Sequence, residues 1–401
     1  MSSIWDLVVG HDEAVAMLKE AVAAERVTHA WLFTGPPGIG KLHTARVFAA
    51  ALNCPAGGDG TCDTCRRILR GVHPDVHLIV PEGDNLLVED VRAVREEASM
   101  THHEARTAVF ILDEADRMTE AAANALLKVL EEPPPEVVFV LVVRSAEALV
   151  GTVPSRARTL PFVSLSLAEL TAALGDDLQL DTGQTAWAAA ASHGRLARAR
   201  ALLADEAART RRSTVLDLTE RLASGQPSDA LAAAATVVAI ADEVAAAARL
   251  RQERELAELE EAFGTGRGTG ALRKRLETRH RRELRRVRFD AIRDSLADLL
   301  GAYRDLALLA PAPPGSPGAP DGAPAAGEAP LVHPDKAGTF TRLAASIDPA
   351  TALRAASAIE EADRRLAIGA APLLTLEAAF LSAQAALRGP VVPINRLAIR
   401  R

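Results

Sequence analysis

Four short apolar runs alternate with helical patterns in the first 163 residues, and this alternation limits the fold more than any other feature. The runs are residues 30–33, 76–80, 108–112 and 137–143. Strands that are apolar throughout and separated by helices are typical of a parallel sheet covered on both faces. Between the last two runs, Thr119 can cap a helix that Pro133 ends. The sequence therefore predicts an α/β domain over residues 1–163.

A glycine-rich segment follows the first run directly and precedes a helical pattern. Its residues are Gly35, Pro36, Pro37, Gly38, Ile39, Gly40 and Lys41. This context predicts a P-loop, in which backbone N–H groups, a helix N-terminus and a lysine hold phosphates. The next position should carry a Ser or Thr hydroxyl for Mg²⁺, but it is Leu42, and Thr44 is poorly placed to replace it. We expect a loop that can hold nucleotide phosphates but transfers them inefficiently.

Two acidic residues, Asp113 and Glu114, end the third apolar run about seventy residues after the P-loop. In a P-loop protein Asp113 would approach Mg²⁺ and Glu114 would orient a water molecule. The alternative is an acidic turn that only caps a helix. The P-loop upstream favours the nucleotide-site interpretation.

The only three cysteines of the chain, Cys54, Cys62 and Cys65, lie within twelve positions on a glycine-containing segment. This number and clustering do not suit a disulfide framework, whereas three thiolates suit tetrahedral Zn²⁺. Asp59 is the first candidate for the fourth ligand, because it repeats the two-residue spacing, and His73 is the second. Incidental cysteines in a reducing cytoplasm, or a redox pair, are the alternatives.

The charge balance argues against general coating of nucleic acid by the protein surface. Lys and Arg number 46 against 53 Asp and Glu, a formal charge of −7, so any DNA contact must be local. The first six residues have neither the basic start nor the apolar run of a signal peptide, and the apolar run 137–143 is far shorter than the roughly 20 residues that span a membrane. We expect a cytoplasmic protein without a membrane partner.

After about residue 164 the sequence reads as helix interrupted by turns such as His193-Gly194 and residues 264–270. We expect a small helical domain over 164–210 and a larger all-α domain over 211–401. Residues 311–330, dense in Pro, Gly and Ala, predict a flexible insertion.

Residues 273–288 hold nine Arg or Lys and two Glu. Four of these arginines share one helical face: Arg275, Arg279, Arg282 and Arg286. A solvated helix face is the first interpretation, and a contact with DNA phosphates or an acidic partner is the second.

The order of the motifs resembles that of the clamp-loader subunits of bacterial DNA polymerase III, an AAA+ family, and the whole looks like the delta-prime type. The resemblance rests on the P-loop, the knuckle 54–65, and segments 71–75, 112–119, 124–134 and 155–156. It is specific over about residues 1–165 and weak beyond about 210, although 373–377 resembles the family's C-terminal helix. It implies an AAA+ domain (1–163), a helical lid domain (164–210) and a helical collar or oligomerisation domain (211–401).

The resemblance also implies partners and a role. The chain would join tau/gamma and delta subunits in a five-subunit ring, a DNA-binding hetero-oligomer that loads the sliding clamp onto primer-template DNA as part of the DNA polymerase III holoenzyme, a nucleotidyltransferase. Its own ATPase would be absent or weak, with ATP or another nucleotide possible and Mg²⁺ left open. Arg156, which we expect just after the last strand of the sheet, would act in trans on ATP bound by the adjacent tau/gamma subunit. The sequence alone favours a surface charge there.

Three departures from the family pattern bear on this role. Asp59 stands where the family's knuckle has a cysteine, and Ala157 replaces the last residue of a Ser-Arg-Cys motif. Ala197 stands where the hydrolysing subunits have a sensor arginine, so Leu42 and Ala197 weaken both ends of the nucleotide site. This fits a stationary subunit. The alternatives are an ATP-hydrolysing tau/gamma-type motor and a zinc-dependent nucleic-acid-binding module.

Overall fold

The computed structural model describes residues 3–81, 85–100, 104–149, 151–177, 181–263, 267–311 and 330–388. The chain forms two compact units, Met1–Thr185 with Gly194–Arg200, and Ala186–His193 with Ala201–Arg401. Residues 164–210 contribute to both units, so the expected domain boundaries remain a prediction. The expected insertion lies outside the described residues, apart from Pro311 and Pro330 at its ends.

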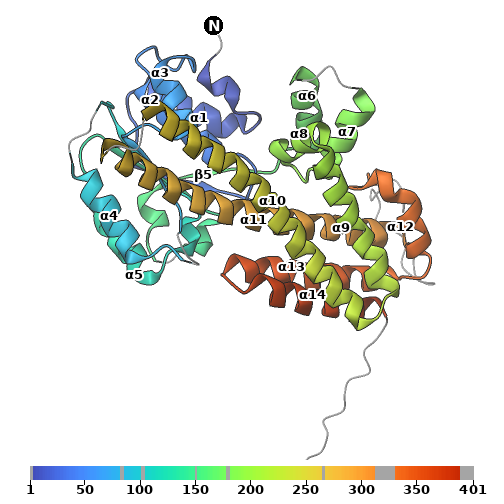
Figure 1. Cartoon of the computed structure of the whole chain (residues 1–401). Coiled ribbons are helices and arrows are strands. Elements are labelled where there is room, and N and C mark those ends of the chain that lie inside the picture. The colour runs from blue at the N-terminus through green and yellow to red at the C-terminus, as the bar shows by residue number, and fades with distance from the viewer. Residues whose placement is uncertain are drawn as a thin grey trace, which may run out of the picture. The chain divides into compact units, whose positions relative to one another are not determined.

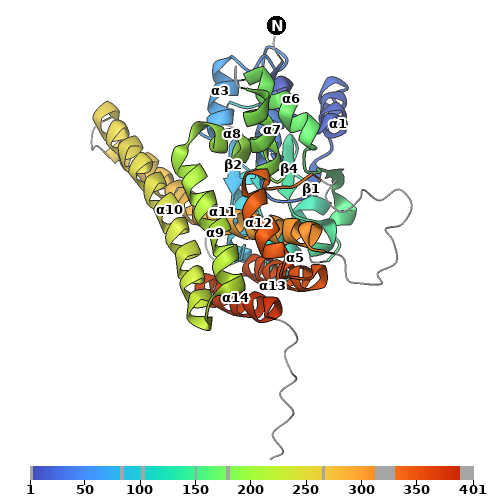
Figure 2. The same ribbon diagram turned by 90° about the vertical axis from the view of Figure 1, so that its right-hand side faces the viewer.

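The first unit is built on a five-stranded parallel sheet in the order β2-β3-β4-β1-β5. Figure 2 labels β2, β4 and β1. The strands are β1 (Ala30–Thr34), β2 (Val76–Ile79), β3 (Ala108–Leu112), β4 (Val137–Val142) and β5 (Arg158–Pro161). The expected α/β fold with a parallel sheet is confirmed, and each of the four apolar runs forms a strand.

The fifth strand corrects the expectation that Arg156 follows the last strand of the sheet. β5 comes after Arg156 and pairs with β1 at the edge of the sheet. Of its four residues only Leu160 is buried, so it lacks the continuous apolar run of the central strands. Its sequence therefore carries little strand signal.

Helices cover both faces of this sheet. Those within the first unit are η1 (Ile4–Leu7), α1 (Asp12–Ala23), α2 (Lys41–Asn53), α3 (Asp63–Arg70), α4 (Val88–Ala98), η2 (Ala115–Arg117), α5 (Glu120–Glu131), η3 (Ala146–Ala148), η4 (Pro154–Arg156) and α6 (Leu167–Asp177). Because side chains alternate along a strand, Trp31 and Phe33 pack with α1, α2 and α3, whereas Leu32 packs on the opposite face with α4 and α5. Thr119 caps α5 by accepting a hydrogen bond from the amide of Ala122, as expected.

Helices α7 (Thr182–Ala191) and α8 (Leu196–Ala204) are divided between the units. Beyond them, helices are the regular secondary structure of the second unit's described residues, which confirms the expected all-α region (Figure 1). Its elements are α9 (Glu206–Ser224), α10 (Pro227–Phe263), α11 (Arg267–Leu309), η5 (Pro334–Lys336), α12 (Ala337–Ala344), α13 (Pro349–Ala367) and α14 (Pro372–Leu387). The turn His193-Gly194 is present, with both residues at positive φ. Of the turn expected at 264–270, residues 264–266 lie outside the described residues, and residues 267–270 already belong to α11.

Helix α10 is both apolar and part of a core. Its stretch Pro227–Glu258 is long and apolar enough to cross a membrane by length and composition, with a mean hydropathy of 1.7 in its best window. The buried residues Ala230, Ala234 and Val237 pack in the helical core of the second unit. This composition therefore suits a core helix, and length and apolar composition alone are weak evidence for a membrane span.

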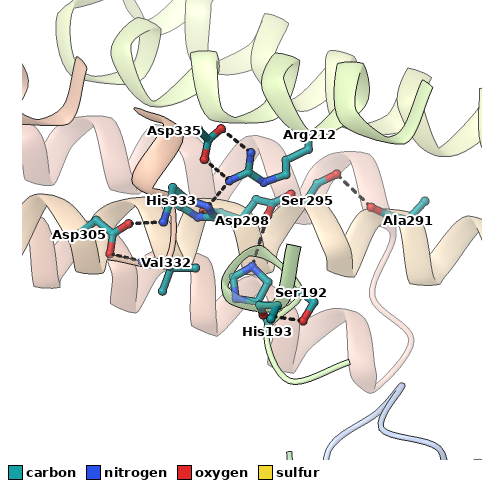
Figure 3. A network of polar contacts seen from close by, with 11 residues as sticks. Ser192, His193, Arg212, Ala291, Ser295, Asp298, Asp305, Val332, His333 and Asp335 are labelled. Atoms are coloured by element: carbon teal, nitrogen blue, oxygen red, sulfur yellow. Dashed lines mark hydrogen bonds and ion pairs between the residues drawn. The ribbon is translucent and has the colours of Figure 1, made fainter. Parts of the chain in front are cut away.

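A buried polar network fastens residues 330–336 to α9 and α11 (Figure 3). Arg212 of α9 pairs with both carboxylate oxygens of Asp335, at 2.7 and 2.9 Å, and its guanidinium lies 2.8 Å from Nδ1 of His333. The backbone N–H of His333 donates to Asp305, and Nε2 lies 3.0 Å from the carbonyl oxygen of Asp298.

These contacts assign the tautomer of His333. Nδ1 must accept from the guanidinium of Arg212, so Nε2 carries the proton and donates to the carbonyl of Asp298. His193, Asp298 and His333 present metal-binding types of atom close together. Because both ring nitrogens of His333 are already engaged and one faces a cation, this network fits a neutral structural histidine better than a metal ligand.

Candidate functional site

The P-loop lies at the carboxyl end of β1, between the neighbouring strands β4 and β5, where open α/β sheets place their ligands. Gly35, Gly38 and Gly40 all have positive φ, which permits the turn that aims backbone N–H groups inward. Lys41 is only 5% exposed, and its Nζ donates to the carbonyl oxygens of Gly35 and Pro36 at 2.5 Å each. The loop is therefore formed as expected, with its lysine folded onto it.

The residues that should serve Mg²⁺ match the sequence interpretation only in part. The hydroxyl of buried Thr44 donates to the carbonyl of Gly40, so it is engaged within α2. Asp113 is buried directly after β3. The carboxylate of Glu114 instead pairs with Arg117 at 2.7 Å. Asp113 thus lies at the carboxyl end of β3, as expected, while Glu114 is held by Arg117 of the same turn.

Three residues at the rim of this site were not singled out from the sequence. Arg144 follows β4, and its carbonyl accepts the N–H of Gly35 at 2.9 Å while its Nε lies 3.6 Å from Asp116. Burial raises the pKa of Asp116 despite this neighbour. A methyl group on Gly38 would lie 2.8 Å from Cδ of Arg195, so Arg195, and not the exposed Ala197, is the residue of this turn that lies on the P-loop. Arg195 is found only once α8 and the loop are folded together.

The knuckle brings Cys54, Asp59, Cys62 and Cys65 together in one cluster. The sulfur atoms of Cys54 and Cys62 are 3.8 Å apart, and Oδ1 of Asp59 lies 3.5 Å from Sγ of Cys54 and 3.7 Å from Sγ of Cys65. Tetrahedral zinc with bonds of about 2.3 Å to sulfur and 2.1 Å to oxygen has ligand separations of about 3.8 Å (S to S) and 3.6 Å (S to O). The donor set and its spacing therefore fit this metal.

Local hydrogen bonds set the charge states in the knuckle. The amide of Cys62 and the hydroxyl of Thr61 donate to Asp59 and hold the pKa of its carboxyl well below its usual range. Burial alone would raise the pKa of the Cys54 thiol, but hydrogen bonds from backbone groups of residues 56, 58 and 59 lower it. Burial raises the pKa of the Cys65 thiol. One carboxylate and one thiol of the cluster thus favour the ionised form that metal ligands need.

His73, the reserve ligand, lies outside this cluster. It is buried, its Nδ1 accepts the N–H of Asp75 at 3.2 Å, and its Nε2 lies 3.5 Å from Glu104. Burial lowers the pKa of His73, so the neutral ring is favoured. Asp75 in turn accepts the N–H groups of Glu104 and Ala105. The segment 71–75 that carried part of the resemblance therefore holds the loop at 104–105.

Arg156 ends the short helix η4, before β5. Its NH1 donates to the hydroxyl and carbonyl oxygens of Thr152 at 2.8 and 3.3 Å, and its NH2 forms an ion pair of 2.6 Å with Glu131, the last residue of α5. The side chain remains 32% exposed. Arg156 is thus an oriented surface arginine.

The basic run 273–288 lies on α11, but the side chains of Arg275, Arg279 and Arg282 lie outside the described residues. Arg286 lies 3.7 Å from Asp290, and Arg273 pairs with both Glu260 and Glu277. Arg273 and Arg286 are therefore at least partly neutralised by nearby acids.

Comparison with known proteins shows which proteins residues 10–166 resemble. A family model described as "DNA polymerase III, delta subunit" matches residues 10–166. The delta' subunit of Bacillus subtilis is 40% identical over 152 residues, which are 37% of this chain and 46% of that protein. Residues 10–166 are therefore similar to clamp-loader subunits of DNA polymerase III, and the delta' match favours the delta-prime type.

Gamma/tau subunits of DNA polymerase III also match this chain, at lower identity. The gamma/tau subunit of Mycobacterium tuberculosis is 36% identical over 160 residues, 39% of this chain and 28% of that protein. The chain thus spans less than half the length of the curated relatives it matches. A gamma-subunit-related protein of Thermotoga maritima is 15% identical over 93% of this chain and 99% of that one, with a TM-score of 0.37, too low to support a functional comparison.

Proposed function

We propose that the whole chain acts as the delta-prime subunit of a bacterial replicative clamp loader, the stationary AAA+ subunit of a five-membered ring with tau/gamma and delta subunits. The observation that carries this proposal is the pairing of a P-loop weakened at Leu42 and Ala197 with an exposed, oriented Arg156. Residues 164–210 and 211–401 would serve as lid and collar domains. The sliding clamp and primer-template DNA are the proposed targets of the assembled ring, in the cytoplasm.

Reconstitution tests this assignment most directly. Native mass measurement of this chain mixed with tau/gamma and delta subunits should give a five-subunit complex that contains one copy of this chain. A mixture without this chain should give no complex of that mass. A complex that forms equally well without it, or from which it is always absent, would exclude the delta-prime role.

The isolated chain should hydrolyse ATP far more slowly than about 1 s⁻¹, the low end of ordinary enzymes. Leu42 offers no oxygen to Mg²⁺, Thr44 is engaged with Gly40, and Ala197 offers no charge to phosphate. A turnover assay with and without DNA checks this, with Lys41→Ala as the control for a contaminating ATPase. Turnover near 1 s⁻¹ that disappears in Lys41→Ala would instead favour the tau/gamma-type motor.

The purified protein should contain one zinc ion per chain, held by Cys54, Cys62, Cys65 and Asp59. The ion would stabilise a knuckle with few other contacts, as structural zinc sites do. Elemental analysis should show stoichiometric zinc in the wild type and in His73→Ala but reduced zinc in Asp59→Ala. Full retention in Asp59→Ala would mean that another group supplies the fourth ligand, and zinc-free wild-type protein would exclude the site.

A further inference from the structure

The contacts of Arg156 assign a role to Glu131 that the motifs alone do not. Glu131 lies on α5 and Arg156 on η4, 25 positions later, and the two side chains meet at 2.6 Å. NH1 of Arg156 is held separately by Thr152 and lies 3.3 Å from the hydroxyl of Ser155. Glu131 of α5, Thr152 before η4 and Ser155 of η4 thus restrain one partly exposed guanidinium.

Stability does not explain the acid at this position. Glu131 ends α5 and is followed by Glu132, although the C-terminus of a helix favours cations and disfavours carboxylates by about 0.3–1 kcal/mol. Glu131 is 50% exposed, and an exposed ion pair typically contributes only about 0.2–1 kcal/mol, which barely offsets that cost. A helix end with two acids, one of them paired to the arginine, therefore gains orientation more than free energy.

The guanidinium of Arg156 keeps N–H donors that the contacts above do not use. Arginine has five N–H donors, and the contacts above engage NH1 and NH2. Within the part of the chain that the structure describes, no group accepts a hydrogen bond from Nε of Arg156. Nε, together with the N–H of NH2 that Glu131 does not occupy, can still donate hydrogen bonds to phosphate oxygens.

We propose that Glu131 is a positioning residue that, with Thr152, aims Arg156 at the phosphate of a nucleotide bound by the neighbouring subunit. This inference rests on the proposed function. Glu131 does not touch the nucleotide. It restricts the rotamers of Arg156, so that this side chain loses less conformational entropy when it contacts the phosphate. A misplacement of about 1 Å in such a group can cost up to about 10²-fold in rate.

The test uses ring complexes reconstituted with variants of this chain and measures ATP turnover as kcat and KM. The quantity of interest is the part of kcat that Arg156→Ala abolishes. Glu131→Ala should lower that part roughly tenfold with KM for ATP unchanged, and Glu131→Gln, which keeps an oxygen for Arg156, should recover part of it. The double variant Glu131→Ala/Arg156→Ala should equal Arg156→Ala alone, because both residues act through one group.

Glu132→Ala is the matched control, since it removes the same charge from the same helix end. Among the described residues, the side chain of Glu132 has no hydrogen bond or ion pair. Glu132→Ala should behave as wild type. The positioning role of Glu131 would be overturned if Glu131→Ala had wild-type or higher turnover, or if Glu132→Ala lost as much turnover. Neither result would contradict the trans role of Arg156. If Arg156→Ala itself has no effect in an intact ring, the trans role of Arg156 is wrong and the role of Glu131 falls with it.

Discussion

Replacing Arg156 with alanine should leave this protein folded and able to assemble, yet lower the DNA- and clamp-stimulated ATPase of the ring. An arginine supplied in trans to a phosphoryl-transfer site is typically worth ~10³ to 10⁵ in rate, so the site that faces this subunit should become nearly silent. The total loss should be partial, because other ATP sites of the ring do not border this chain. Steady-state ATPase of reconstituted complexes, compared at equal assembly, measures the effect.

The structure supports the expectation that folding is unaffected. Arg156 is partly exposed, and its ion pair with Glu131 should contribute less than about 1 kcal/mol. Arg156→Lys should rescue poorly, because an ammonium group cannot reproduce the planar, two-bond contact with phosphate. Arg158→Ala removes the same charge from a guanidinium that instead stacks over Trp31 at 5.2 Å, and it should retain ATPase. Equal rates for wild type and Arg156→Ala would mean that this chain supports the ring only as a scaffold.

The second unit should lose stability as the pH falls from about 6.5 to about 4. Burial, with a smaller contribution from Arg212, lowers the pKa of His333 to about 4, although Asp298 opposes the shift. The unfolded chain takes up the proton first, near pH 6.5, so the free energy of unfolding falls through this window and levels off below the folded pKa. A difference of about 2.5 pH units at 1.36 kcal/mol each gives a loss on the order of 3 kcal/mol.

Urea denaturation at several pH values checks this, with Trp187 as the probe. Trp187 belongs to the second unit and lies 5.4 Å from Arg212, whereas Trp5 and Trp31 belong to the first and can be replaced by Phe. His333→Gln should be less stable at pH 7 but show a flatter pH dependence, because the titrating group is gone. An unchanged slope in His333→Gln would mean that other groups cause the acid sensitivity.

Much of the first unit could be predicted from sequence because its signals are local. A central parallel strand is buried on both faces, so residues 108–112 and 137–142 read as continuous apolar runs. The edge strand β5 buries only Leu160, so its sequence has no continuous apolar run. The P-loop and the knuckle are contiguous in sequence, so spacing alone was enough to propose their residues.

The sequence by itself therefore determined the fold class, the P-loop, the absence of a Mg²⁺-binding hydroxyl at Leu42 and the set of cysteines. Only the tertiary structure decided that Asp59 and not His73 joins those cysteines, that Arg195 lies on the P-loop, and that Glu131 holds Arg156. It also showed that Arg212 and His333, 121 positions apart, form one buried network. The physical reason is that a hydrogen bond or ion pair depends on atoms a few ångströms apart, and such proximity between distant segments leaves no periodic trace in the chain.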